Sequence, residues 1–419
     1  MVTSASDGTP RARVRALVVG SELLDGSVRD ANTCHLGGWL DRRGGQLVEV
    51  RLLPDDPGRV AEAVRDARAG DVAVVVCGGL GPTRDDRTRE AVAAALERDL
   101  VVDASAGRGR ARRPRGAETL PNPAGVAPGF ASDEGSWWIV ALPGVPRELR
   151  AMLDGAAGAW IAERLSGRGR PRRRVRLAGI PESEVARKIE GMPELEGLDV
   201  RSYPASGTVD VVLLDEEEAR SGADGRLRKA VVALRRRLGD DVYEVGDRGL
   251  AEVLEARLRE MGGSLAVAES CTGGMLGAEL TAVPGSSDVF WGGVVSYADE
   301  AKQRLLGVSP STLASHGAVS EATAVAMARG VREIAGASLG VAVTGIAGPG
   351  GGRPGKPVGT VWIAVSARDD AARRFEFRGG RREVRVRSVH AALDLARRSL
   401  TGSEPAAAGS GSEETGRTT

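Results

Sequence analysis

The segment Ser264-Leu-Ala-Val-Ala-Glu-Ser-Cys-Thr-Gly-Gly274 joins a short apolar strand to a turn whose two glycines begin the next helix. Backbone N–H groups at a helix start lack partners within the helix, so such a turn can hold an anionic or carbonyl oxygen. Ser270 lies in this turn, where it can attack the held group if a base takes its proton. The amides expected to hold the oxygen are those of Thr272, Gly273 and Gly274. The segment therefore predicts an α/β unit with a serine nucleophile at the end of a strand.

Lysine is rare, with four lysines against 54 arginines, so arginine is the default positive charge in this chain. A buried amine can lose its proton whereas a guanidinium effectively cannot, so Lys302 is a candidate base. Tyr297, one of three tyrosines, precedes it in Ser-Tyr-Ala-Asp-Glu-Ala-Lys. We predict that Ser270, Tyr297 and Lys302 form a catalytic group, with either Tyr297 or Lys302 as the immediate base. The alternative is that Lys302 is an exposed helix charge beside Glu300.

Composition limits the class of protein. At 419 residues the chain needs two or three domains, and its formal charge of +1 gives no overall attraction to nucleic acid or membrane. The three cysteines have no paired or metal-ligand spacing. The first residues resemble no signal peptide, and no apolar run approaches membrane-spanning length. We expect a cytoplasmic protein with no direct nucleic-acid or membrane partner.

Short apolar runs alternate with helical periods between residues 13 and 164. The predicted strands are 14–19, 47–53, 72–77 and 138–142, and the predicted helices are 32–43, 57–69, 88–97 and 146–164. This alternation predicts a mostly parallel, helix-covered α/β sheet. Residues 105–116 are rich in Gly, Arg and Ala without periodicity, and are predicted to be a loop.

The remaining chain divides into a small unit, a larger unit and a tail. Residues 168–174 carry arginines without interleaved aromatics, which favours a solvated linker over a nucleic-acid patch. The following α+β pattern is of ferredoxin-like or KH-like size, but it lacks a Gly-x-x-Gly clamp for RNA. The Ser/Gly/Glu-rich end predicts disorder. The predicted domains are 12–166, 172–246 and 248–402, followed by a disordered tail at 403–419.

A second glycine-rich turn follows the predicted strand at 339–343. Such a loop lets backbone amides approach a phosphate without obstruction by a Cβ atom. Lys356 lies beyond the loop and could supply a point charge to the phosphate. The alternative is a flexible surface loop. The candidate substrate-binding residues here are Thr344, Gly345, Gly348, Gly350 and Lys356.

These parts together describe a covalent amidase or esterase acting on a phosphorylated small molecule. His316 and His390 are the only histidines of this unit and neither lies in a glycine-rich turn, so a Ser-Lys site is favoured over Ser-His-Asp. The unit contains Ala268-Glu-Ser-Cys-Thr-Gly-Gly, Pro284-Gly-Ser-Ser, Gly292-Gly-Val-Val-Ser-Tyr, Glu300-Ala-Lys, His316-Gly-Ala-Val-Ser, Val343-Thr-Gly-Ile-Ala-Gly-Pro-Gly-Gly and Lys356-Pro-Val-Gly-Thr-Val.

These motifs resemble the CinA C-terminal domain, a family that includes nicotinamide mononucleotide deamidases. The resemblance implies hydrolysis of the nicotinamide carboxamide to give nicotinate mononucleotide and ammonia, as in pyridine-nucleotide salvage. It implies that Ser270 is the nucleophile, that Tyr297 and Lys302 assist it, and that no cofactor is needed. It also implies an arginine near the ligand, for which Arg385 is the candidate, and a homodimer.

The first unit carries Gly20-Ser-Glu-Leu-Leu-Asp-Gly, Asp55-Asp56 and Gly78-Gly-Leu-Gly-Pro-Thr-Arg-Asp-Asp-Arg-Thr. One interpretation is that Asp85 and Asp86 cap the following helix. The other, compatible with it, is a phosphate cradle whose carboxylates hold Mg²⁺ through Asp85 and Asp86. The candidate residues of this N-terminal site are Glu22, Asp55, Gly78, Gly79, Gly81, Asp85 and Asp86.

The same segments, with Leu120-Pro-Asn-Pro and Leu142-Pro-Gly-Val-Pro, resemble the CinA N-terminal domain, which is similar to the molybdopterin-binding MoaB/MogA fold. Some members of that family are ADP-ribose pyrophosphatases. The whole chain therefore resembles a full-length CinA protein: a MoaB/MogA-like α/β/α domain, a small KH-like α+β domain and an α/β/α amidase domain. The alternative function is that of a competence- or DNA-damage-associated binding or scaffold protein without amidase activity.

Overall fold

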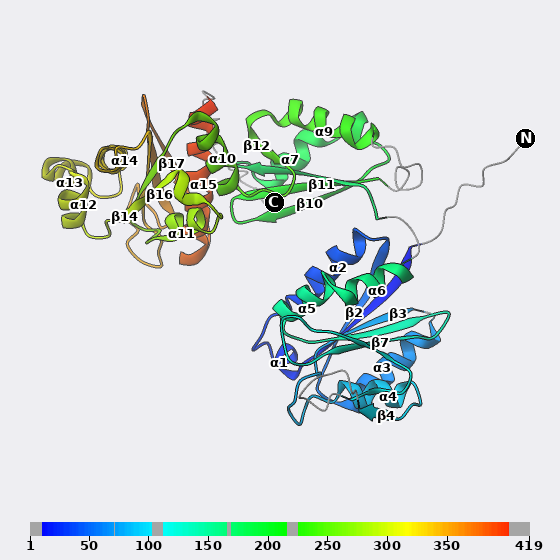
Figure 1. Cartoon of the computed structure of the whole chain (residues 1–419). Helices are drawn as coiled ribbons and strands as arrows, with labels where there is room; N and C mark the ends of the chain where they lie inside the picture. Colours follow the sequence, from blue (N-terminus) through cyan, green and yellow to red (C-terminus); the bar gives the residue numbers. More distant parts are fainter. Residues whose placement is uncertain (1–10, 71, 103–111, 166–168, 216–224, 402–419) are drawn as a thin grey trace, which may run out of the picture. The chain divides into compact units, whose positions relative to one another are not determined.

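The structure, a computed structural model, describes residues 11–70, 72–102, 112–165, 169–215 and 225–401. It divides into two compact units (Figure 1). One unit comprises Met1–Pro171 with Asp215–Asp224, and the other comprises Arg172–Leu214 with Gly225–Thr419. The predicted second and third domains thus pack together within one unit. The predicted tail lies outside the described residues.

The first unit is built on a six-stranded sheet of order β2-β1-β3-β8-β7-β6. Its strands are β1 (Ala12–Val19), β2 (Gly45–Leu53), β3 (Ala73–Cys77), β6 (Glu118–Leu120), β7 (Gly129–Asp133) and β8 (Trp138–Leu142). The four predicted strands are the parallel ones, and β7 and β6 extend the sheet in antiparallel fashion. The mostly parallel sheet is confirmed, whereas β6 and β7 were not predicted.

Helices cover both faces of this sheet. The helices are α1 (Ser21–Leu24), α2 (Asn32–Asp41), α3 (Pro57–Ala69), α4 (Thr88–Ala95), α5 (Pro146–Leu153) and α6 (Ala156–Arg164). Apolar side chains of α2, α5 and α6 pack on one face, and those of α3 and α4 pack on the other. The α/β/α layering is therefore confirmed.

Two predictions of secondary structure in this unit were wrong. The single helix expected at 146–164 is broken at Gly155, whose φ of −115° and ψ of −141° are not helical. The stretch 105–116, expected to be a loop, contains strand β5 (Arg112–Pro114), which pairs antiparallel with β4 (Leu100–Val102). Strands of three residues are too short to show an alternating pattern. Residues 105–111 of that loop lie outside the described residues.

The small domain of the second unit is a four-stranded antiparallel sheet of order β10-β11-β9-β12 with helices packed on it. Its elements are β9 (Arg172–Ala178), α7 (Glu182–Ile189), η1 (Pro193–Leu195), β10 (Asp199–Ala205), β11 (Thr208–Leu214), α9 (Gly225–Leu238), η2 (Gly239–Asp241) and β12 (Val242–Val245). The linker predicted at 168–174 is wrong from Arg172 onward, because Arg174 and Arg176 pair with Asp210 on the neighbouring strand. The α+β pattern is confirmed.

The larger domain contains a five-stranded sheet of order β14-β13-β15-β16-β17. Its strands are β13 (Leu265–Glu269), β14 (Phe290–Val295), β15 (Leu339–Gly345), β16 (Thr360–Ser366) and β17 (Asp370–Glu376). The first three strands in that order are parallel, and β16 and β17 are antiparallel to their neighbours. The parallel part places three strand ends at one edge of the sheet.

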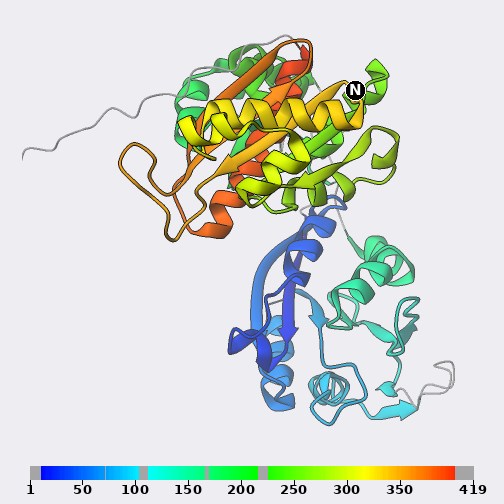
Figure 2. The ribbon, with the colours of Figure 1, turned by 90° about the vertical axis from the view of Figure 1, so that its left-hand side faces the viewer.

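Helices again cover both faces. They are α10 (Leu250–Met261), α11 (Met275–Thr281), η3 (Ser286–Asp288), α12 (Asp299–Leu306), α13 (Pro310–His316), α14 (Glu321–Ala335) and α15 (Arg381–Thr401). One face packs against α10, α11 and α15, and the other against α12 and α14. Figure 2 shows α14, in yellow, lying along this second face. No helix of the described segments is both long and apolar enough to cross a membrane.

A buried cluster of charges connects the two domains of the second unit. Asp394 on α15 is 6% exposed and accepts hydrogen bonds from Arg397 (2.6 Å) and Arg398 (2.8 Å). Arg398, 4% exposed, also donates to the carbonyl of Ala178 (3.2 Å) and to Asp241 (3.1 Å). Removing one partner of a buried ion pair is costly because the opposite charge stays behind without compensation.

We therefore expect Asp394→Ala to lower the free energy of unfolding by about 3 kcal/mol or more. Thermal unfolding of the full chain measures the loss, with Asp369→Ala as an exposed control that should change little. Equal midpoints for the two variants would contradict a stabilising role for the cluster.

Candidate functional site

The predicted catalytic segments meet at the edge where the parallel strands end. Ser270 follows β13, Tyr297 lies two residues after β14, and the second glycine-rich turn follows β15. The amide of Ser270 donates to the carbonyl of Val343 (2.9 Å), and the amide of Ser296 donates to the carbonyl of Glu269 (2.8 Å). Ligands of open α/β sheets bind at the carboxyl ends of parallel strands, which is where these residues lie.

Lys302 is buried rather than exposed. Its side chain is 1% exposed, and its Nζ donates to the carbonyls of Ser296 (3.0 Å) and Tyr297 (3.2 Å). Burial lowers the pKa of Lys302, and Asp299, 3.6 Å away, opposes that shift only in part. The alternative of an exposed helix charge is therefore wrong. A neutral amine that donates both hydrogens to these carbonyls keeps its lone pair for a third partner.

Tyr297 is held at the surface of the site by an arginine that the sequence analysis did not single out. Its side chain is 59% exposed, and its Oη accepts a hydrogen bond from Nη2 of Arg381 (2.9 Å). Nη1 of Arg381 donates to the carbonyl of Gly348 in the second glycine-rich turn (2.7 Å). The predicted Arg385 donates to the carbonyl of Thr272 (2.6 Å) in the turn that follows Ser270. Arg381 and Arg385, both on α15, thus contact the site.

Glu269 organises the turn around Ser270. Its carboxylate, 2% exposed, accepts hydrogen bonds from the amides of Gly274 (3.0 Å), Leu276 (3.0 Å) and Gly277 (2.8 Å). These are the donors that the start of α11 leaves without helical partners. Glu269 therefore fixes the position of the helix start relative to the strand that carries Ser270.

The expected oxyanion donors need a correction. The amide of Gly274 is engaged by Glu269, and the amide of Gly273 donates to the carbonyl of Ser270 (3.1 Å). The amides of Cys271 and Thr272 have no acceptor within the described segments. The available donors are thus Thr272, as expected, and Cys271 in place of the two glycines.

We expect Glu269→Ala to destabilise the protein by about 3 kcal/mol, because three amides lose a buried charged acceptor. The exposed Glu279→Ala on α11, the helix whose start Glu269 holds, is the matched control. Chemical unfolding of both variants checks the prediction, and an unchanged midpoint for Glu269→Ala would contradict it.

The second glycine-rich turn is tied to the segment between α13 and α14. Oγ1 of Thr344 donates to the carbonyl of Ala318 (2.8 Å), and Nζ of Lys356 donates to the carbonyls of His316 (3.0 Å) and Val319 (2.7 Å). Burial lowers the pKa of Lys356. Lys356 therefore anchors the turn, rather than standing free as a charge for a phosphate.

The glycines of this turn have different requirements. Gly348 has a φ of +84°, and a Cβ there would lie 2.6 Å from Val358. A Cβ on Gly345 would lie 2.7 Å from the side chain of Val361, whereas one on Gly350 would meet nothing within 4 Å. The close approach of neighbouring side chains explains Gly345, the same with a positive φ explains Gly348, and nothing in the structure explains Gly350.

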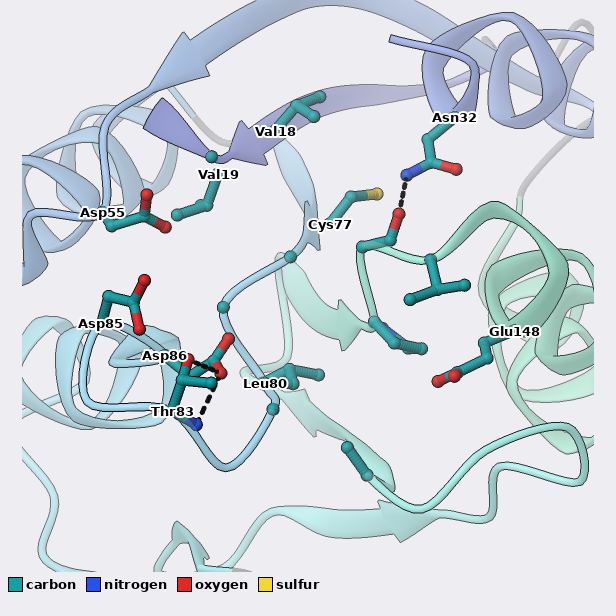
Figure 3. A pocket seen from close by; sticks show the side chains of 18 of the residues that line it. Val18, Val19, Asn32, Asp55, Cys77, Leu80, Thr83, Asp85, Asp86 and Glu148 are labelled. Atoms are coloured by element: carbon teal, nitrogen blue, oxygen red, sulfur yellow. Dashed lines mark hydrogen bonds between the residues drawn. The ribbon is translucent and has the colours of Figure 1, made fainter. Parts of the chain in front are cut away.

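All seven predicted residues of the N-terminal site line one cavity of about 930 Å³ (Figure 3). The cavity lies where β1 and β3 end, at Val19 and Cys77. A Cβ on Gly78 would lie 2.3 Å from the carbonyl oxygen of Val19, so glycine permits this close approach. Acidic side chains outnumber arginines in the lining. An anionic ligand here would gain from an accompanying cation.

The expected helix cap by Asp85 and Asp86 is wrong. Helix α4 begins at Thr88 without a side-chain cap. Asp86 instead accepts hydrogen bonds from the amide (2.9 Å) and the hydroxyl of Thr83. The Thr83 side chain nearby, followed by a backbone amide, lowers the pKa of Asp85, so this exposed carboxyl stays ionised at neutral pH.

The chain's own side chains do not complete a metal site here. No group of three His, Cys, Asp or Glu side chains in the described ranges could hold a metal ion. Mg²⁺ is commonly held by one or two carboxylates together with substrate phosphates and waters. Asp85 and Asp86 fit that arrangement, in which the ligand brings the remaining oxygens.

The fold and the two sites define a multidomain α/β protein with a MoaB/MogA-like domain, a KH-like domain and a C-terminal domain carrying the Ser270 site. Three family models match the chain in that order. They are described as "Probable molybdopterin binding domain" (residues 15–163), "Damage-inducible protein CinA KH domain" (172–243) and "CinA C-terminal domain" (247–400).

Similar proteins cover nearly the whole chain. A CinA-like protein of Gemmatimonas aurantiaca is 40% identical over 92% of this chain and 96% of its own length. One of Myxococcus xanthus is 38% identical over 93% and 98%. The crystal structure of competence damage-inducible protein A from Klebsiella pneumoniae is 40% identical, covering 37% of this chain and 98% of that one, with a TM-score of 0.35. The chain belongs to the CinA family.

Proposed function

We propose that the C-terminal domain is an amidase that hydrolyses the carboxamide of nicotinamide mononucleotide. The observation that carries the proposal is Lys302: an amine 1% exposed, with its pKa lowered by burial, at the sheet edge where Ser270 lies. A lowered pKa makes the amine easier to deprotonate, and a lysine in its neutral form can remove a serine proton without histidine. The family resemblance supplies the substrate.

The proposed reaction has two halves. Ser270 Oγ attacks the carboxamide carbon while its proton passes to Nζ of Lys302, and the amides of Cys271 and Thr272 bind the oxyanion. The C–N bond then breaks, and the nitrogen takes one proton and leaves as ammonia. Water, deprotonated by Lys302, attacks the Ser270 ester, releasing nicotinate mononucleotide and the serine hydroxyl. Apart from the attacking water, the proposed chemistry uses only side chains and amides of the chain.

Cys271 does not compete with Ser270 for the substrate. The thiol is 5% exposed, and burial raises its pKa to about 12. Only the thiolate is a strong nucleophile, so Cys271 remains a packing residue at neutral pH. Arg385 places positive charge beside the site, which suits a substrate that carries a phosphate.

The experiment is to incubate the full chain with nicotinamide mononucleotide and to measure ammonia and nicotinate mononucleotide. Equal amounts of the two products are expected, with lower kcat/KM for nicotinamide riboside, which lacks the phosphate. No turnover of the mononucleotide would contradict the proposal. That outcome would favour the second class of function, a binding or scaffold role in competence or DNA damage.

The N-terminal cavity suggests a second activity. It is large enough for a dinucleotide-sized ligand, and it brings together the acidic and glycine residues expected for a site that hydrolyses ADP-ribose to two monophosphates with Mg²⁺. The discriminating pair is Asp85→Ala and Ser270→Ala. Loss of ADP-ribose hydrolysis in Asp85→Ala but not in Ser270→Ala would support two separate sites. A wild-type protein that does not hydrolyse ADP-ribose would contradict this second activity.

A further inference from the structure

Arg381 makes two hydrogen bonds that link the two sides of the Ser270 site. Nη2 donates to the hydroxyl oxygen of Tyr297, and Nη1 donates to the carbonyl of Gly348. Arg381 is the first residue of α15, and the start of that helix is held by Glu383, which accepts from the amide of Gly380 (2.9 Å). The guanidinium is therefore attached to a packed helix while it contacts two separate strand-end segments.

The guanidinium can only donate, and this determines which partner accepts in the hydrogen bond between Arg381 and Tyr297. A guanidinium has five donors and no acceptor, so the Tyr297 oxygen must accept from it. The hydroxyl proton of Tyr297 then points to some other acceptor. Lys302 already donates to the backbone carbonyl of Tyr297, so both ends of the residue are fixed.

We propose that Arg381 is a positioning residue that aims the Tyr297 hydroxyl as the proton donor for the leaving nitrogen. This inference rests on the proposed amidase function and assigns the two helpers that the sequence left open: Lys302 is the base and Tyr297 is the acid. The proton of Ser270 goes to Lys302, and the proton of Tyr297 goes to the departing nitrogen. The phenolate then recovers a proton from the Lys302 ammonium, so the charges balance before water attacks.

The test compares two substrates with different leaving groups. An amide nitrogen must be protonated to leave, whereas 4-nitrophenolate leaves without a proton. We expect Arg381→Met to lower kcat for nicotinamide mononucleotide on the order of tenfold with little change in KM. The 4-nitrophenyl ester of nicotinate mononucleotide should be hydrolysed at the wild-type rate. Tyr297→Phe should show the same pattern with a larger loss.

Two controls separate positioning from a structural defect. Arg382→Met removes the same charge from the neighbouring exposed residue and should leave both rates unchanged. Millimolar guanidinium chloride should restore part of the amide rate of Arg381→Met, because the free cation can donate to Tyr297.

The outcomes are distinguishable. A wild type that hydrolyses neither substrate overturns the proposed function and this inference together. If the wild type is active, an Arg381→Met variant with unchanged kcat overturns the inference alone. The inference is also overturned if the Arg381→Met variant hydrolyses both substrates more slowly by the same factor, because that pattern indicates a folding defect. It is overturned as well if only KM rises, because that pattern indicates weaker substrate binding.

Discussion

Ser270→Ala is expected to lower the turnover of nicotinamide mononucleotide by about 10⁴-fold or more, since removal of a serine nucleophile leaves only binding and oxyanion contributions. The fold should be unaffected. Ser270 Oγ makes no hydrogen bond to any part of the chain that the structure describes, so its loss leaves no buried group unpaired. Ammonia release measures the effect, with unfolding midpoints recorded in parallel.

The control is Ser311→Ala, which removes an exposed hydroxyl of the same domain and should retain full activity. Near wild-type turnover in Ser270→Ala would contradict a serine nucleophile. If that residual activity were also lost in Ser270→Ala with Cys271→Ala, the neighbouring thiol would be the nucleophile instead.

Lys302→Met is expected to cost 10²- to 10⁴-fold in kcat/KM, roughly the range for loss of a general base. Lys302→Arg should be equally inactive, because a guanidinium keeps its proton and offers no lone pair. Lys229→Met, at an exposed position of α9, is the matched control. Substantial activity in Lys302→Arg would show that this position supplies only charge.

The pH profile follows from the same residue. The base must be neutral, so kcat/KM is expected to rise with pH through the pKa of Lys302 and to be lost below it. Because burial lowers that pKa from its ordinary value, the rise should occur below the range of a solvent-exposed lysine. A profile that rises only in that alkaline range would contradict a desolvated base.

Much of this fold was readable from local sequence because its elements are long enough to show a period. The helix Pro57–Ala69 and the strand Trp138–Leu142 have the predicted bounds. The three-residue strands and the helix break at Gly155 were not predicted, because three residues or one glycine give too weak a sequence signal.

The site was predictable in part, for chemical reasons. A rare lysine in an arginine-rich chain pointed to Lys302, and its burial agrees with that reasoning. Arg381 gave no such signal, since it lies among many arginines and its role depends on contacts with residues distant in sequence. Glu269 was overlooked for a similar reason: its carboxylate accepts from amides five to eight residues later, which only the turn brings close.

The N-terminal site was likewise predictable only in part from the sequence. The motifs assigned the segments that follow β1 and β3 to one site, and these segments line one cavity. The hydrogen bonds of Asp86 to Thr83 could not be predicted from spacing, because a carboxylate before a helix can cap either the helix or the preceding turn.

The central claim, an ester on Ser270, is tested most directly by partition of that ester between water and hydroxylamine. Nicotinamide mononucleotide and the 4-nitrophenyl ester of nicotinate mononucleotide are each hydrolysed in the presence of hydroxylamine, and the ratio of hydroxamate to acid is measured. A common acyl-enzyme predicts the same ratio from both substrates and no enzymatic hydroxamate from Ser270→Ala. Different ratios, or hydroxamate formed without Ser270, would contradict the account.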